Sequence, residues 1–404
     1  MTVSAVGAMS AVSAVGAMSA LRTAGAPRTV RRSGFTIAAD GAYAACLAET
    51  VTPGGSGGPE SGGLLPERWT LTGPEPYAVP LPGRQPEEPG TQVLPLAGGR
   101  VLIRRRVADR HDLALLHPGC GELLVGSLPC GDVRLLPPAP GAAYALGHEE
   151  DGDRTGIWRV HGTPGAGPEL VMTVPGRCTG GVWLDRAGRL LAVDRELDGC
   201  TKAVAADLHT GRISPLLQIT ADSDDRLLLA EPDSGLLLLR SDATGEARLG
   251  WGVLGSRRPV RFPDALRVPG ALLTPVAAQP GQILMPEASV VALRAEVPGG
   301  AESLALWRPG ERRLHWRASP PGWLGAAGMW LPGDELRLPY AAGDRGCGLA
   351  AYDPPASWPE PVLALSEGAV VQSPARPPAP APSARREWCV LPLQQAPLAG
   401  ARAG

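Results

Sequence analysis

Lysine is almost missing from this 404-residue chain, and so is any net charge. Lys202 is the only lysine beside 37 arginines, and the formal net charge is −2. Proteins that bind nucleic-acid phosphates or anionic membranes usually carry a basic excess, so neither partner is expected. Arginine has GC-rich codons, and its use in place of lysine is typical of a high-GC bacterial genome rather than of a binding signal.

Paired cysteines and long apolar runs are also lacking. The seven cysteines are odd in number, widely spaced and form no C-x-x-C pair, which argues against a disulfide framework and a zinc knuckle. Reduced thiols in a cytoplasmic protein are therefore expected. No run approaches 18 apolar residues, so no transmembrane helix is expected. The N-terminal arginines follow the weakly apolar segment, which is the wrong order for a secretory signal.

Glycine and proline, in contrast, are abundant. The 53 glycines and 44 prolines make almost a quarter of the chain. Many of them separate short apolar runs of about five to eight residues, which is typical of strands joined by tight turns. The aperiodic remainder lies in the duplicated N-terminus 1–33, the insertion 52–66 and the proline-rich segment 374–382. The pattern predicts an all-β protein.

Two kinds of tight turn alternate seven times along the chain. The first kind joins the first two runs of each unit and the second kind joins the last two, with glycine supplying the positive φ of tight hairpins. Units of about 47 residues with four strands each match the blades of a β-propeller. The first kind lies at 40–41, 98–99, 140–141, 187–188, 224–225, 280–281 and 333–334, and the second at 72–73, 118–119, 164–165, 210–211, 244–245, 309–310 and 353–354.

One of these turns carries a known signature. The segment Asp207–Gly211 (DLHTG) resembles the D-x-x-T-G turn between the outer strands of WD40-like and TolB-like propeller blades. Ser241–Gly245 is a shortened version, and Ala39–Gly41 is similar to the P-D-G turn between the inner strands. The resemblance covers about four fifths of the chain and concerns the fold, so it implies a single seven-bladed propeller of four-stranded antiparallel blades and no particular activity.

The predicted organisation has four parts. They are a disordered N-terminus at 1–33, the propeller at 34–366, a proline-rich linker at 367–385, and a closing strand with a tail at 386–404. The isolated strand 387–393 is placed to return to an early blade and to remove an exposed sheet edge. Two β-sandwiches are the alternative fold, although sandwiches give no reason for two turn classes to alternate.

Ionisable residues gather in the loops between the second and third strands of the predicted units. These loops would share one rim of the ring, where several blades converge on a ligand. The alternative is that such hairpin loops are simply polar and solvated. The candidate binding residues on this rim are Arg106, Arg110, His111, Asp151, Asp194, Arg195, Glu196, Asp344 and Arg345.

No motif points to a defined catalytic or metal chemistry. Gly54–Gly58 satisfies G-x-S-x-G but lacks the strand and helix of a nucleophile elbow. Lys202 does not follow the glycine-rich turn of a phosphate-binding loop. His111, His117 and Cys120 have metal-ligand side chains, but the turn at His117 would point it away from His111. We therefore assign no catalytic residue, no metal ligand and no cofactor.

The expected function is that of a non-catalytic binding or scaffold module that presents the charged rim to a protein or a small molecule. The protein is expected to be a monomer. The alternative is a hydrolase or lyase with its site at the mouth of the propeller channel. A third reading is a stand-alone relative of the propeller that gates prolyl-oligopeptidase-like peptidases, without peptidase activity of its own. If the protein is an enzyme, we expect converging carboxylates or a histidine with perturbed pKa values. If it is a scaffold, we expect an exposed apolar patch.

Deletion of residues 383–404 tests the closing strand. The truncated chain would keep an unpaired sheet edge, so we expect its melting temperature to fall by several degrees below that of the full chain. Calorimetry of both proteins measures the difference. A truncation that melts together with the full chain would rule out the closing strand.

Overall fold

The computed structural model describes residues 29–52, 60–73, 75–149, 153–162, 165–283, 285–325, 327–342 and 346–355. This part of the chain contains 26 strands, three short 3-10 helices and no α-helix. None of its helices has the length and apolar character needed to cross a membrane. The linker 367–385, the predicted closing strand 387–393 and the serine motif at 54–58 lie outside the described residues.

The strands follow one another as antiparallel sheets in chain order. The first three sheets have four strands each: β1 (Thr29–Ile37), β2 (Tyr43–Thr52), β3 (Glu60–Thr70) and β4 (Tyr77–Pro80); β5 (Gln92–Pro95), β6 (Val101–Val107), β7 (Arg110–His117) and β8 (Gly121–Leu128); β9 (Asp132–Leu135), β10 (Ala143–His148), β11 (Arg154–His161) and β12 (Glu169–Pro175). β1 begins five residues before the predicted start of the propeller, and β3 begins inside the segment 52–66.

The remaining strands continue the same pattern. They are β13 (Arg177–Trp183), β14 (Leu190–Leu197), β15 (Cys200–Asp207) and β16 (Arg212–Pro215); β17 (Asp225–Glu231), β18 (Leu236–Ser241) and β19 (Arg248–Val253); β20 (Leu272–Ala278), β21 (Val291–Glu296), β22 (Ser303–Trp307) and β23 (His315–Ala318); β24 (Met329–Leu331), β25 (Glu335–Ala342) and β26 (Gly346–Tyr352). A single parallel bridge between Lys202 and Asp225 joins the fourth and fifth groups into one sheet. That each of the seven described groups is a separate blade stays a prediction.

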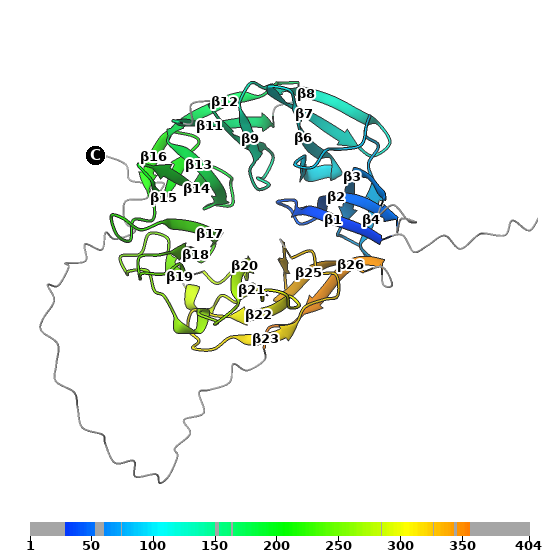
Figure 1. Ribbon diagram of the computed structural model, residues 1–404. Helices are drawn as coiled ribbons and strands as arrows, with labels where there is room; N and C mark the ends of the chain where they lie inside the picture. Colours follow the sequence, from blue (N-terminus) through cyan, green and yellow to red (C-terminus); the bar gives the residue numbers. More distant parts are fainter. Residues whose placement is uncertain are drawn as a thin grey trace, which may run out of the picture.

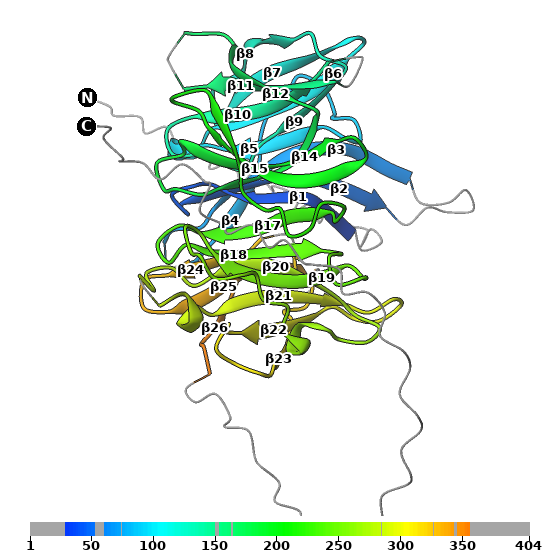
Figure 2. The ribbon, with the colours of Figure 1, turned by 90° about the vertical axis from the view of Figure 1, so that its left-hand side faces the viewer.

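The sheets stand around a common centre, with the first sheet beside the last (Figure 1). A view turned by 90° shows neighbouring sheets stacked on one another (Figure 2). The first strand of each group faces the centre. First strands of neighbouring groups contact one another from β1 to β5 to β9 and from β13 to β17, β20 and β24, while β13 contacts β10 and β11 of the third group. This arrangement is a β-propeller, so the predicted all-β propeller fold is confirmed.

The second strands form the most deeply buried layer. Leu236 to Leu239 of β18 are four consecutive leucines, and each is 0% exposed. A strand with one solvated face would alternate apolar and polar residues, so a continuous apolar run indicates that both faces are covered. The covering comes from the neighbouring sheets, because Leu237 and Leu239 pack toward the fourth group while Leu236 and Leu238 pack toward the sixth.

Apolar packing also joins the two ends of the described ring. Phe35 and Trp69 of the first sheet are buried and meet edge to face, with ring centroids 5.0 Å apart. Met329, Cys347 and Leu349 of the last group pack against this pair, and β26 contacts β4. Within the described residues, the first and last sheets are thus held together by side chains.

The fifth group departs from the predicted turn pattern. The sequence predicts a reversal at 224–225, but Asp225 begins β17 and the chain reverses at 232–235, where Gly235 has a φ of 72°. The turn at 244–245 then joins the second and third strands of this group and not a third strand to a fourth. The prediction fails because an aspartate doublet is typical of turns, whereas Asp225 is fully buried and its carboxylate is satisfied by the fold.

The carboxylate of Asp225 accepts hydrogen bonds from both sides of the junction between the fourth and fifth groups. Lys202 Nζ lies 2.9 Å away, the hydroxyls of Ser223 and Ser241 donate at 2.9 and 2.6 Å, and the Ile219 N–H donates at 2.9 Å. Lys202 also donates to the carbonyl of Thr220. A buried ion pair of this kind depends on having every partner in place.

Lys202→Met should therefore destabilise the protein strongly. It leaves the Asp225 charge buried without its cation, so we expect the free energy of unfolding to fall by about 3 kcal/mol or more in urea denaturation. Lys202→Met with Asp225→Leu should recover part of that loss, since no charge is then left buried. Arg248→Met, whose partner Asp264 is exposed, should change stability little. Equal losses for the single and double variants would contradict this account.

Candidate functional site

A cavity of about 660 Å³ lies at the centre of the ring. Its wall is built by β1, β5, β9, β13 and β17, together with Ala327 and Gly328 just before β24, and Asp194 reaches it from β14. Six of the seven groups contribute to it. The volume falls in the range of roughly 300–1,000 Å³ that is usual for small-molecule sites.

Asp194 is a buried carboxylate in this wall. Its side chain comes from a second strand, is 5% exposed, and accepts a hydrogen bond of 2.9 Å from the Leu227 N–H of β17. The strand in front of it, β13, has a bulge between Thr179 and Val182. Gly180 in this bulge has a φ of 73°, and a Cβ there would lie 2.9 Å from Asp194 Oδ2. Glycine thus leaves room for the carboxylate behind the inner strand.

The surroundings of Asp194 change its acidity. Burial raises the pKa of Asp194 to about 6, although the Leu227 N–H and the charges of Arg226 and Arg134 act in the opposite direction. An aspartate with such a pKa exchanges its proton close to neutral pH. A carboxyl group perturbed in this way and placed in a cavity is a candidate for a functional role.

Two arginines stand near this carboxylate. Arg134 of β9 is exposed and lines the cavity. Arg226 of β17 is half-buried and donates to the hydroxyls of Thr179 and Thr201, at 3.4 and 2.9 Å. Neither guanidinium has a carboxylate within 4 Å among the described residues. The local charge is therefore positive even when Asp194 is ionised.

The other residues predicted for the rim are not brought together here. Arg195 and Glu196 follow Asp194 along β14, and Glu196 is exposed. Arg106 and Arg110 lie at the exposed β6–β7 hairpin, where Arg110 pairs with an aspartate at 2.9 Å. Outside the described residues lie Asp151, Asp344 and Arg345.

His111 is buried and does not lie on the rim. It is 2% exposed, and its Nδ1 lies 3.4 Å from a guanidinium nitrogen of Arg104. Burial lowers the pKa of His111, and the charge of Arg104 lowers it further. The imidazole is thus kept neutral within the wall between two sheets and is not offered to a ligand.

Sequence reasoning missed Arg134 and Arg226 because it looked for charge in loops. Both lie on inner strands, directly before the apolar residues Leu135 and Leu227. A charged residue on an inner strand of a propeller can reach the central cavity. That signal was available once the inner strands were identified.

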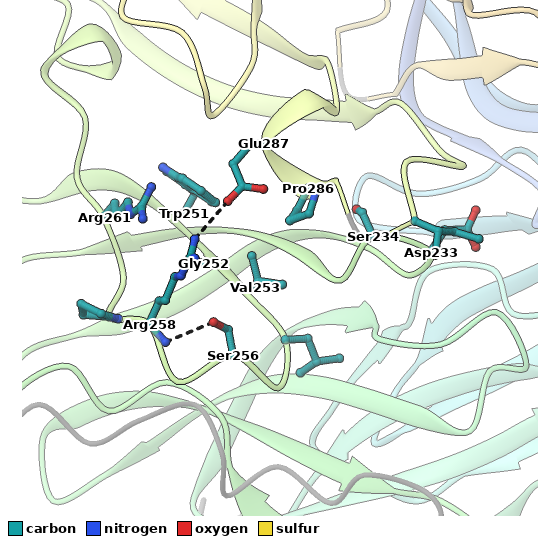
Figure 3. Close-up of a pocket in the computed structure, with 13 residues that line it drawn as sticks. Asp233, Ser234, Trp251, Gly252, Val253, Ser256, Arg258, Arg261, Pro286 and Glu287 are labelled. Atoms are coloured by element: carbon teal, nitrogen blue, oxygen red, sulfur yellow. Dashed lines mark hydrogen bonds and ion pairs between the residues drawn. The ribbon is translucent and has the colours of Figure 1, made fainter.

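A second cavity, of about 580 Å³, lies between the fifth and sixth groups (Figure 3). Arg258 pairs with Glu287 at 3.6 Å, and the Arg261 guanidinium lies over the Trp251 ring at 5.1 Å from its centroid. Asp233 accepts the Gly281 N–H at 3.1 Å and is also bound by an arginine. Because these charged groups already have protein partners, this cavity offers less to a ligand than the central one.

Metal chemistry finds no support in the described part of the chain. No group of three or more histidine, cysteine, aspartate or glutamate side chains is placed there to hold a metal ion. The cavity residues themselves offer one carboxylate and several arginine and amide nitrogens. This set of groups suits an organic anion better than a metal cation.

Comparison with known proteins gives the fold and no more. No family model and no curated protein matches the sequence. A solved structure described as part of an analysis of two prolyl endopeptidases is 11% identical with a TM-score of 0.50, over 80% of this chain and 50% of its own. Prolyl oligopeptidase B from Galerina marginata, bound to a 35mer substrate, is 10% identical with a TM-score of 0.50, over 78% of this chain and 44% of its own.

TolB from Acinetobacter baumannii is 14% identical with a TM-score of 0.39, over 78% of this chain and 82% of its own. The chain spans about half the length of the two kinds of peptidase. At such identities the likeness concerns the propeller architecture alone. It does not carry over a substrate or a partner.

Asp194→Asn tests the raised pKa. The ordinary pKa of an unfolded aspartate is about 3.9, so the folded state binds more protons between about pH 4 and 6, and stability falls as the pH rises through that window. Asparagine can still accept the Leu227 N–H and carries no charge. We expect the variant to be more stable than the wild type at pH 7.5, by about 2 kcal/mol in urea unfolding.

The advantage of Asp194→Asn should almost disappear near pH 4, where the wild-type carboxyl is protonated in the folded state and about half protonated in the unfolded state. Urea unfolding at pH 4, 6 and 7.5 gives the comparison. A variant that is less stable than the wild type at pH 7.5 would contradict the raised pKa.

Proposed function

We propose that this protein is a non-catalytic binding module that takes a small molecule into the central cavity of its propeller. The observation that carries this proposal is the cavity of about 660 Å³ in which Arg134 is exposed without a carboxylate partner beside the buried Asp194. The volume suits a small organic ligand. Charged groups that lack protein partners are available to bind one.

The energetics of the site support a role in binding. An aspartate with a raised pKa destabilises the folded state at neutral pH, and two arginines without ion pairs add like charges in the same place. Conflicts of this kind, in an otherwise well-packed protein, concentrate at functional sites. We attribute the loss of folding stability at Asp194 to a role of this side chain in ligand binding.

The exposed leucines of the outer strands support a protein partner as a second part of this function. Leu123 and Leu124 of β8 are 66% and 62% exposed, and Leu170 of β12 is 47% exposed. The two strands belong to neighbouring sheets and come close, since a Cβ on Gly126 of β8 would lie 2.5 Å from Pro168 Cδ, just before β12. Neighbouring exposed apolar side chains are typical of protein interfaces, so the outer edge is where we place a scaffold role.

A hydrolase or lyase is the alternative function, and one observation favours it. A carboxyl with a pKa of about 6 is suited to proton transfer near neutral pH. Hydrolysis by a carboxylate pair needs a second acid within about 10 Å, whereas Asp194 is the only carboxylate among the described residues that line the cavity. The binding function therefore has the stronger support.

A thermal-shift panel tests the proposal. The probes are glucose, lysine methyl ester, citrate, trialanine and octanoate, each in matched ionic strength. A ligand at ten times its dissociation constant adds about 1.4 kcal/mol of stability, so we expect at least one probe to raise the melting temperature by a few degrees. Thr36→Trp, which places an indole in the cavity from β1, should abolish that shift.

Two further variants keep the test valid if Thr36→Trp misfolds. Arg134→Gln should weaken the shift without filling the cavity, and Arg258→Gln, in the second cavity, should leave it unchanged. If no probe stabilises the protein, or if the shift survives in Thr36→Trp and Arg134→Gln, the binding proposal is wrong. Conversion of a probe to a new product, detected by mass spectrometry and lost in Asp194→Asn, would favour the enzyme.

A further inference from the structure

We infer that the ligand of the central cavity is a small amphiphile, with an anionic oxygen head at the arginine end and an apolar body toward the other end. This inference rests on the proposed binding function of the cavity and names the chemical class of its ligand. The observations that carry it are the direction of the inner strands and the order of residues along them.

The inner strands of the first five groups all run in the same direction. A group of four antiparallel strands ends on the face of the ring where it began, so the next inner strand runs in the same direction as the one before. This holds for the first four groups. In the fifth group, a bridge between Trp251 and Arg261 takes the place of the fourth strand. The beginnings of β1, β5, β9, β13 and β17 therefore lie toward one end of the cavity and their last residues toward the other.

Polar lining residues come first and apolar lining residues come last on two of these strands. On β5, Gln92 precedes Leu94, and on β9, Arg134 precedes Leu136. Asp194 is paired with Thr179 near the beginning of β13, while Val182 lines the cavity from the end of that strand. Because the strands are parallel around the centre, these residues give the cavity a polar end and an apolar end.

The charges at the polar end favour an anion. Arg134 lines the cavity, and Arg226 lies close enough to lower the pKa of Asp194, so these two positive charges exceed the single carboxylate whether or not Asp194 is protonated. A guanidinium such as that of Arg134 binds a carboxylate or phosphate through paired N–H donors. A cationic ligand would be repelled by both arginines.

The apolar end favours a hydrocarbon body. Ile37, Leu136, Val182 and Leu228 line the cavity from four different strands. A fully polar ligand such as a sugar would lose water at this end without gaining hydrogen bonds there. An aliphatic body would instead gain about 0.8 kcal/mol for each buried methylene group.

A chain-length series tests the apolar end. Isothermal titration calorimetry at pH 7.5 with butanoate, hexanoate and octanoate, all below their micelle concentrations, should show the affinity rising by about fourfold for each added methylene group. Affinities that do not depend on chain length would overturn the inference.

A head-group series tests the polar end. Octanol and octylamine should bind at least tenfold more weakly than octanoate, whereas octyl phosphate should bind at least as well, since phosphate and carboxylate share the recognised anionic oxygens. Arg134→Gln should lower the octanoate affinity at least tenfold. Arg258→Gln, in the second cavity, is the matched control and should have no effect. Equal binding of octylamine and octanoate would overturn the inference.

The pH dependence adds a signature that a purely structural role of Asp194 would not produce. Protonation of Asp194 removes the one negative charge near the head, so octanoate should bind more tightly to the wild type at pH 5.5 than at pH 7.5. In Asp194→Asn this difference should vanish. An equal pH effect in the variant would contradict the assigned position of the head.

The outcomes also separate this inference from the function on which it rests. Suppose that trialanine or citrate binds, that Thr36→Trp abolishes this binding, and that octanoate does not bind. The inference of an amphiphilic ligand is then wrong, and the binding function stands. If no probe of either set binds, both are wrong.

Discussion

The whole structure depends on one constraint: a small antiparallel sheet cannot bury both of its faces alone. Leu236 to Leu239 show the constraint most plainly, since four consecutive buried leucines need a neighbour on each side of β18. Arranging the sheets around a centre answers this requirement, because each sheet then covers the face of the next. The contact of Phe35 and Trp69 with the last group extends the same packing across the two ends of the described chain.

The central cavity is a consequence of this packing. Inner strands that meet around an axis leave a space whose lining is set by their side chains. Because the strands run in a common direction, the polar residues at their beginnings and the apolar residues at their ends lie at opposite ends of the cavity. Asp194 belongs to a second strand and reaches this space only because Gly180 and the bulge of β13 remove the side chain that would stand before it. The site is therefore built by the backbone as much as by the charged groups.

Much of the fold could be predicted from the sequence, because turns and apolar runs are local features. The hairpins at 72–73, 118–119, 164–165, 210–211 and 309–310 all join a third strand to a fourth. The fifth group could not be predicted in the same way, because the burial of Asp225 depends on Lys202 and Ser241, and no local pattern reveals those contacts. Of the predicted rim residues, Asp194 lines the cavity while His111 is buried elsewhere. Arg134 and Arg226 were missed, since their role comes from their position around the axis.

The solitary lysine has a chemical consequence of its own. Lys202 Nζ is held by Asp225, Thr220 and Ser223 and is 12% exposed. In the folded protein, the only side-chain amine of the chain is thus ion-paired, hydrogen-bonded and shielded, which makes it a poor nucleophile. Acylating reagents and amine-directed cross-linkers would find almost no side-chain target in the folded protein. A side-chain amine that becomes reactive would report that the junction between the fourth and fifth groups has opened.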